Sequence, residues 1–379
     1  MTLPPLGLYI HLPWCERKCP YCDFNSHEAQ DIPEDAYIDA LLRDLSADLP
    51  LVQDRPVDTL FIGGGTPSLF SGAAVKRLLR EIGQLLTLSP DLEATMEANP
   101  GSAEAENFAD FREAGINRLS LGIQSFQDAQ LQALGRVHDS EQAHAAIGYA
   151  KAAGFDSINL DLMHGLPQQD CAAAMEDLRS AISYQPAHLS WYQLTIEANT
   201  VFHSCPPRLP AEDQLADIQD DGERLLAAEG YRQYEVSAYS QPDYQCRHNL
   251  NYWRFGDYLG IGAGAHGKIS ADDGSITRYA KRRQPPAYMS CAHGEFAATR
   301  HTIAREDLSG EFMLNALRLN AGFTTAEFEA RTGLDASEME PALAQLAEKG
   351  LLEQDNNGIR TTAQGRRFLD SVVMEFFPG

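Results

Sequence analysis

The chain has 379 residues, 44% of them hydrophobic, and a formal net charge of −24 at pH 7. This length predicts about two or three domains, and the hydrophobic fraction excludes a wholly disordered chain. Because so acidic a surface repels phosphate backbones, we expect no nucleic acid among the partners.

The amino-terminal stretch lacks the form of a secretory signal, because Pro4, Pro5 and Pro13 interrupt its apolar residues and Arg17 is its first basic residue. The sequence has no run of about 18 apolar residues, so we expect no membrane span. Seven cysteines are few for this length and odd in number, which disfavours a disulfide-rich secreted fold. We therefore expect a cytoplasmic protein.

Short β-like segments alternate with helical ones through the first two-thirds of the chain. The predicted strands cover 6–12, 57–62, 92–97, 117–124, 157–162 and 188–196, and the clearest helices cover 33–49, 71–86, 103–114 and 212–228. This alternation predicts an α/β fold with a parallel sheet, either open and doubly wound or curved into a barrel. In both, functional groups gather at the carboxyl ends of the strands.

Candidate functional residues follow this rule. Cys15 comes after the first predicted strand and Gly64 after the second, while Glu97 and Gln124 end the third and fourth, and Asp161 lies at the end of the fifth. Purely structural residues would have little reason to share one rim of the sheet. The pattern therefore predicts a site at that rim.

The last third of the chain has a different texture. Residues 233–268 are rich in aromatic residues and glycine, 271–300 read as a polar linker, and 301–379 read as helices followed by a hairpin near Leu351–Leu352 and Gly358–Ile359. We predict three parts: a barrel at 1–235, a substrate-associated segment and linker at 236–300, and a small winged-helix-like domain at 301–379. The last of these is acidic on balance, which disfavours a DNA-binding role.

The spacing Cys15-x3-Cys19-x2-Cys22 is the strongest signal in the sequence. Thiolates are soft ligands, and three on one short loop suit an iron–sulfur cluster or zinc. A structural zinc site normally has four ligands, and His11, Asp23 or His27 could supply the fourth, so zinc stays open at this point. Three ligands on a four-iron cluster would leave one iron free to bind a small chelating molecule.

The segment from Leu8 to Phe24, LYIHLPWCERKCPYCDF, resembles the cluster loop of the radical S-adenosylmethionine (SAM) superfamily. More narrowly, it is similar to the branch that contains oxygen-independent coproporphyrinogen III dehydrogenases and HemW-type haem chaperones. The resemblance implies a partial parallel (β/α)6 barrel. It also implies a [4Fe–4S] cluster held by Cys15, Cys19 and Cys22, with exchangeable SAM on the open iron.

Later motifs share the resemblance in the same order. They include Gly63-Gly64-Gly65-Thr66-Pro67 after the second strand, where glycines let backbone groups approach a ligand closely, although the same residues could form an ordinary tight turn. The SAM contacts that the resemblance implies are Tyr9, Tyr21, Gly64, Gly65, Thr66, Glu97, Gln124, Arg136 and Asp161.

The string His248-Asn249-Leu250-Asn251-Tyr252-Trp253 distinguishes the two branches. A histidine beside aromatic residues is most often a hydrogen-bonded structural residue. Haem iron, however, takes an axial imidazole, and the string resembles the H-N-x-x-Y-W haem-binding signature of HemW-type proteins. The resemblance therefore implies His248 as a haem ligand. Cys246, two residues upstream, could compete with it as a ligand.

Two further features bear on function. The spacing Gly262-x-Gly264-x-x-Gly267 formally matches a dinucleotide fingerprint, but no helix start follows it, so we reject that interpretation. The dehydrogenases carry a further cysteine two residues after the third cluster cysteine, where this chain has Phe24. This departure weakens the interpretation as an oxidative decarboxylase.

We therefore predict a haem chaperone that transfers haem to an acceptor apoprotein, for example a membrane-associated respiratory protein, with an electron donor such as a flavodoxin. The alternatives are an oxygen-independent coproporphyrinogen III dehydrogenase, radical chemistry on haem itself, and a zinc-stabilised binding protein.

Overall fold

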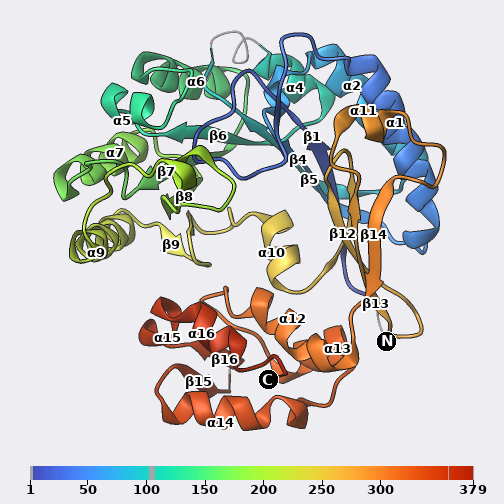
Figure 1. The fold of residues 1–379 in the computed structure, drawn as a ribbon, viewed down its shortest axis with the longest axis vertical. Coiled ribbons are helices and arrows are strands. Elements are labelled where there is room, and N and C mark those ends of the chain that lie inside the picture. The colour runs from blue at the N-terminus through green and yellow to red at the C-terminus, as the bar shows by residue number, and fades with distance from the viewer. Residues whose placement is uncertain (1–2, 102–106, 357, 379) are drawn as a thin grey trace.

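The computed structural model describes residues 3–101, 107–356 and 358–378, and its main body is a curved sheet of twelve strands (Figure 1). Six parallel strands follow one another in chain order: β1 (Leu6–Leu12), β4 (Val57–Gly64), β5 (Leu88–Ala98), β6 (Arg118–Gln124), β7 (Ser157–His164) and β8 (His188–Gln193). These strands confirm the predicted α/β fold with a partial parallel barrel.

Additional strands extend the sheet at both edges. Beside β1 lie the parallel strand β11 (Asp257–Ile261) and then the antiparallel strands β12 (His266–Ser270), β13 (Ile276–Lys281) and β14 (Ala297–Thr302). Beside β8 lie β10 (Ala238–Ser240) and β9 (Arg232–Gln233), both antiparallel. A separate short pair, β2 (Trp14–Cys15) and β3 (His27–Glu28), belongs to the cysteine loop.

Helices cover the outer face of the sheet (Figure 1). They are α1 (Glu34–Asp48), α2 (Gly72–Leu85), α4 (Phe108–Ala114), α5 (Asp128–Ala133), α6 (Ser140–Ala152), α7 (Cys171–Ser183), α9 (Glu212–Ala228) and α11 (Pro285–Met289). Two shorter helices lie elsewhere: α8 (Val201–Ser204) contacts the cysteine loop, and α10 (Arg247–Trp253) lies below the barrel, toward the carboxyl-terminal domain (Figure 1). Side-chain caps fix several starts: the Ser71 hydroxyl accepts from Ala74 N at 3.2 Å ahead of α2, and Asp139 and Gln142 form a reciprocal capping box on α6.

Two sequence predictions need correction or qualification. Residues 271–300 are not a linker, because β13 lies within them and β14 begins within them, both paired in the main sheet. The prediction failed because β14 is almost wholly exposed and so lacks the alternating apolar residues that mark a strand. The start of the predicted helix at 103–114 lies outside the described residues, and α4 accounts for its end.

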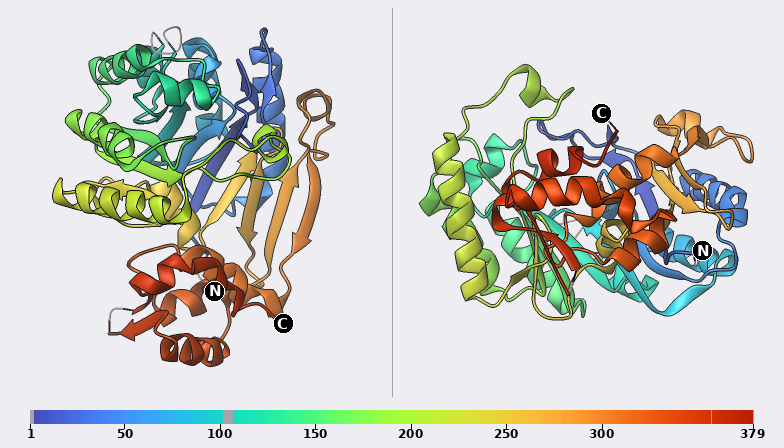
Figure 2. Two further views of the ribbon diagram at one scale, coloured as in Figure 1. Left: turned by 60° about the vertical axis from the view of Figure 1, so that its left-hand side comes forward. Right: turned by 90° about the horizontal axis from the view of Figure 1, so that it is seen from below.

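The carboxyl-terminal domain has its own hydrophobic core and lies beneath the sheet in the left view of Figure 2, and in front of it in the right view, which looks from below. It comprises α12 (Leu308–Ala316), α13 (Thr325–Thr332), α14 (Glu340–Glu348), the antiparallel hairpin of β15 (Leu352–Asp355) and β16 (Gly358–Thr361), α15 (Ala363–Arg367) and α16 (Leu369–Met374). This arrangement confirms the expected small helical domain, and the hairpin lies where the sequence predicted it. No helix in the described part of the chain is both long and apolar enough to cross a membrane.

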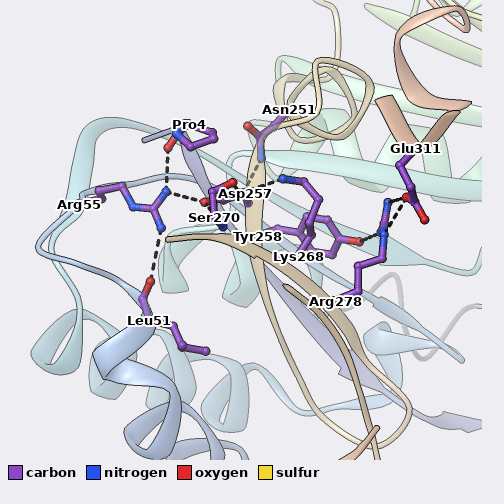
Figure 3. Close-up of polar contacts among 10 residues, drawn as sticks. All are labelled: Pro4, Leu51, Arg55, Asn251, Asp257, Tyr258, Lys268, Ser270, Arg278 and Glu311. Carbon is purple, nitrogen blue, oxygen red and sulfur yellow. Dashed lines mark hydrogen bonds and ion pairs between the residues drawn. The ribbon is translucent and has the colours of Figure 1, made fainter. Parts of the chain in front are cut away.

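Ion pairs connect this domain to the sheet, and the added strands to the amino-terminal segment (Figure 3). Arg278 of β13 pairs with Glu311 of α12 at 2.6 Å. At the start of β11, the fully buried Asp257 carboxylate accepts from Arg55 at 2.7 Å and from Lys268 at 2.9 Å. These contacts connect the amino-terminal segment, the added strands and the carboxyl-terminal domain.

Candidate functional site

The interior of the curved sheet is a cavity of about 440 Å³. Tyr9, Glu97 and Asp161 are each partly exposed, whereas the residues on either side of them in the same strand are buried. Because successive side chains of a strand point to opposite faces, these three side chains face the interior together. Tyr9, Glu97 and Gly64 line the cavity itself.

The three cysteines lie on the loop that follows β1. Cys15 is buried in β2, while Cys19 and Cys22 are partly exposed and are joined by a turn in which Cys22 N donates to Cys19 O at 3.1 Å. All three are free thiols. In the described part of the chain, no three His, Cys, Asp or Glu side chains are grouped around a position for a single metal ion.

Polar groups surround these thiols. The Arg136 guanidinium donates to the Cys19 sulfur at 3.7 Å, and the Ser26 hydroxyl lies 3.8 Å from the Cys22 sulfur. Burial raises the pKa of the Cys15 thiol, and the neighbouring hydroxyls of Thr66 and Ser26 partly offset that rise. A positive charge and hydroxyl donors beside thiols stabilise the thiolates that ligate metals.

Arg136 is held in place by backbone and side-chain acceptors. Its Nη2 donates to Asn99 Oδ1 at 2.6 Å and to Gly122 O at 2.9 Å. Its Nε is buried and has no hydrogen-bond partner among the described residues. Arg136, a predicted SAM contact, therefore lies at the cluster loop with one N–H donor that is not used.

The glycine loop packs directly against the cysteine loop. Gly65 N donates to Leu12 O at 2.8 Å, and Thr66 N donates to Trp14 O at 2.7 Å. A Cβ on Gly65 would lie only 2.4 Å from Trp14 O, and Gly64 adopts a φ of +123°. Glycine is therefore required here by the close approach of two backbones.

Gly65→Ala is expected to destabilise the protein by about 1–3 kcal/mol, because the added methyl group must push the Trp14 backbone and the adjoining Cys15 away. The shift should also lower the iron bound after anaerobic reconstitution. Gly148→Ala is the matched control, since a Cβ there meets nothing within 4 Å and the residue lies inside α6. Thermal unfolding and iron analysis check both; equal behaviour of the two variants would contradict this account.

Glu97 and Asp161 place two carboxyl groups in one interior. Burial, followed by the charge of Asp161, raises the pKa of Glu97 to about 8, while Gly64 N donates to its Oε2 at 3.2 Å. Burial also raises the pKa of Asp161, which accepts from Ser120 at 2.9 Å and Asn159 at 2.8 Å. A cationic ligand would relieve this repulsion, and SAM carries both an ammonium and a sulfonium group.

The remaining predicted SAM contacts lie on the β6–β8 side. Gln124 ends β6 with a φ of +66°, an uncommon conformation for a residue other than glycine, and its Oε1 accepts from Tyr192 at 2.8 Å. Tyr21 packs against Phe202 with ring centroids 6.3 Å apart, in a cluster that includes Leu134. Both therefore lie where side chains near the cluster loop meet the barrel interior.

His248 lies on α10 and fills the floor of the barrel. It is 1% exposed, its Nδ1 shares a hydrogen bond with the Thr59 hydroxyl at 2.8 Å, and its Nε2 shares one with the Tyr252 hydroxyl at 2.7 Å. Burial, followed by the charge of Arg118, lowers its pKa to about 3, so the imidazole is neutral. Tyr252, not His248, lines the cavity, and it stands between Nε2 and that space.

Cys246 is wholly buried and precedes α10, with its sulfur 3.8 Å from Glu93 Oε1. Burial raises the pKa of this thiol to about 11, which disfavours the thiolate needed for ligation. The Gly262–Gly264 segment leads from β11 into β12 and not into a helix, as expected from rejecting the dinucleotide interpretation.

Two residues of the site, His11 and Asn99, were not predicted from the sequence as contacts. His11 lines the cavity, with Nδ1 bonded to Tyr9 at 2.9 Å and Nε2 to Asn25 O at 2.9 Å. Asn99 connects Arg136 to Thr66, whose hydroxyl accepts from Asn99 Nδ2 at 3.0 Å. His11 lies two residues after Tyr9, and Asn99 lies two residues after Glu97. Because residues two apart in an extended chain face the same side, this spacing could have identified both.

These residues fit a [4Fe–4S] cluster with bound SAM. The donor set is three thiols with a cation beside one of them, and a glycine loop and two carboxyl groups lie next to it.

Comparison with known proteins agrees with this geometry. A model of the radical SAM superfamily matches residues 9–178, and a model of the HemN C-terminal domain matches 303–368. The chain is 50% identical to the haem chaperone HemW of Escherichia coli K12 over 99% of both chains. The chain belongs to the HemW family of radical SAM proteins.

Other similarities extend this result. The haem chaperone HemW of Bacillus subtilis 168 is 34% identical over 97% of this chain and 98% of its own. The crystal structure of coproporphyrinogen III oxidase (HemN) from E. coli, a radical SAM enzyme, superposes with a TM-score of 0.83 and 26% identity, covering 99% of this chain and 90% of that one. Membership of the radical SAM superfamily confirms the [4Fe–4S] cluster and SAM as the expected cofactors.

Proposed function

We propose that this protein binds haem in the barrel cavity, beside its cluster and SAM, and passes it to haem-accepting apoproteins. The observation that carries the proposal is the similarity over almost the whole chain to curated HemW haem chaperones. The acceptor is a membrane-associated respiratory protein, the electron donor is a flavodoxin, and the protein works in the cytoplasm.

In this proposal Cys15, Cys19 and Cys22 hold the cluster, and Arg136 stabilises the Cys19 thiolate from 3.7 Å. When bound, the cluster would supply an electron and an open iron for SAM to chelate. The remaining assigned SAM contacts are Tyr9, Tyr21, Gly64, Gly65, Thr66, Glu97, Gln124, Arg136 and Asp161. Glu97 and Asp161 offer their carboxyl groups to the cationic parts of SAM.

The cavity walls suit a flat macrocycle. Tyr9, Tyr252 and Tyr258 line the cavity, and the rings of Tyr252 and Tyr258 meet edge to face at 4.5 Å. Phe24 lies at the mouth and is 62% exposed. Aromatic faces pack favourably against a porphyrin. His248 would reach haem iron through Nε2 once Tyr252 releases it.

A transfer experiment tests the proposal. The reconstituted protein is loaded with haemin and mixed with an apo-b-type cytochrome in the presence of excess serum albumin, which captures free haem. We expect the Soret band of the cytochrome to develop faster than from haemin–albumin alone. Failure to bind haemin, or transfer no faster than from albumin, would overturn the proposal.

The second candidate is the coproporphyrinogen III dehydrogenase reaction, which the similarity to HemN favours. Phe24, at the place of the dehydrogenases' additional cysteine, argues against it. An anaerobic assay with coproporphyrinogen III, SAM and a reductant distinguishes the two. We expect no protoporphyrinogen IX above the level of a Cys19→Ser control, and its formation would favour the enzyme.

A further inference from the structure

The lining of the cavity is basic as well as aromatic. Besides the tyrosines, three basic side chains line it: His11, His266 and Arg283. Burial lowers the pKa of His11, against the hydrogen bond to Asn25, and it lowers the pKa of His266; the charge of Arg283 lowers both further. These basic side chains lie together in a chain that is strongly acidic as a whole.

Arg283 is fixed by the cluster loop. Asn25, three residues after Cys22, donates through Nδ2 to Arg283 O at 2.9 Å and to Ala263 O at 2.8 Å. The Arg283 Nε donates back to Asn25 Oδ1 at 3.4 Å. This arrangement holds the guanidinium at the mouth of the cavity, between the cysteine loop and the turn that joins β11 to β12.

Three cations of the added strands form ion pairs, whereas Arg283 does not. Lys268 pairs with Asp257 at 2.9 Å and Arg278 with Glu311 at 2.6 Å (Figure 3), and Lys281 pairs with Asp44 at 2.5 Å. Among the described residues, no carboxylate forms an ion pair with Arg283. The one acidic neighbour in the lining besides Glu97 is Asp23, which is exposed and also forms no ion pair within the described chain.

A guanidinium without an ion-pair partner, in a cavity that tyrosines also line, suits a ligand that combines a flat ring system with a carboxylate. Guanidinium binds carboxylate through two parallel hydrogen bonds, which gives orientation as well as affinity. We propose that Arg283, with His266 beside it, binds a propionate carboxylate of the tetrapyrrole at the cavity mouth. This inference rests on the proposed haem binding and names the residues that orient the ligand.

The test compares Arg283→Gln with Arg282→Gln. Arg282 is the matched control, because it is also exposed but its Nε donates to Glu295 O at 3.1 Å and it does not line the cavity. Each variant is titrated with haemin and with haemin dimethyl ester, which lacks the carboxylates, and affinity is read from the Soret band. We expect Arg283→Gln to weaken haemin binding by about 10-fold to 100-fold and to leave ester binding unchanged.

Other outcomes would overturn the inference. An equal loss of affinity for haemin and for the ester would indicate lost packing. An unchanged affinity for haemin would show that Arg283 does not bind the propionate. SAM also carries a carboxylate, so SAM affinity is measured in parallel. A loss confined to SAM would assign Arg283 to that ligand and contradict the inference. If the unmodified protein binds no haemin, the proposed function fails as well, whereas intact binding with an indifferent Arg283→Gln variant refutes this inference alone.

Discussion

His248→Ala is expected to lower the free energy of unfolding by about 2–4 kcal/mol, measured by urea unfolding of the protein without haem. The substitution leaves an apolar void under Phe61, whose ring stacks on the imidazole at 5.2 Å. It also removes the partner of the Thr59 hydroxyl and that of the Tyr252 hydroxyl. A change below about 0.5 kcal/mol, the level of a surface substitution, would contradict this role.

Tyr252→Phe separates the structural role of His248 from ligation of haem. If Nε2 must exchange its bond with Tyr252 for haem iron, removing that hydroxyl lowers the cost of binding. We therefore expect Tyr252→Phe to bind haemin about 3-fold to 10-fold more tightly and to keep a histidine-ligated Soret band, which His248→Ala should lose. An unchanged Soret band in His248→Ala would show that His248 does not ligate haem and has only a structural role in the barrel floor.

Asp257→Asn is expected to destabilise the protein by about 3–5 kcal/mol, because it leaves Lys268 as a buried cation without its counter-charge. The Asp257 side chain is fully buried and also accepts from Ser270 N and Oγ, both at 2.9 Å (Figure 3). Burial alone would raise the pKa of Asp257, but the Lys268 and Arg55 charges hold it below its ordinary value. The carboxylate is therefore charged at neutral pH.

A control and a rescue make this prediction specific. Glu113→Gln breaks an exposed pair with Lys76 and should change stability by no more than about 0.5 kcal/mol. Adding Lys268→Met to Asp257→Asn should restore much of the lost stability, since a neutral pair no longer buries an unpaired charge. A double variant as unstable as the single one would show that charge pairing is not the cause.

Sequence alone was sufficient to predict the barrel and to place several candidate residues near one edge of its sheet, although Asp161, predicted at the end of its strand, lies three residues inside β7. Local apolar runs determine strands such as β1, whose bounds match the prediction, and the helix α9 matches as well. β4 runs two residues past the predicted end because Gly63 and Gly64 pair with His11 and Leu12 of β1, which no local pattern reveals. Strand order then places Cys15, Gly64 and Glu97 at one edge.

Contacts between distant residues could not be predicted. Lys281 and Asp44 form a buried pair across more than two hundred positions, and the Asp257 carboxylate joins Arg55 and Ser270 from two other parts of the chain. Likewise, the motif at His248 predicts a residue type but not that Thr59 and Tyr252 occupy both ring nitrogens. Such pairings depend on how strands and helices pack, and so they appear only in the folded structure.

Three thiolates are expected to hold a four-iron cluster whose fourth iron is open to SAM. Anaerobic reconstitution with iron and sulfide, followed by electron paramagnetic resonance of the reduced protein with and without SAM, tests it most directly. We predict about four irons and four sulfides per chain, and a spectrum that changes when SAM is added. Serine at Cys15, Cys19 or Cys22 should abolish the cluster, whereas Cys205→Ser, at an exposed thiol, should not. Zinc without sulfide, or a spectrum indifferent to SAM, would contradict the account.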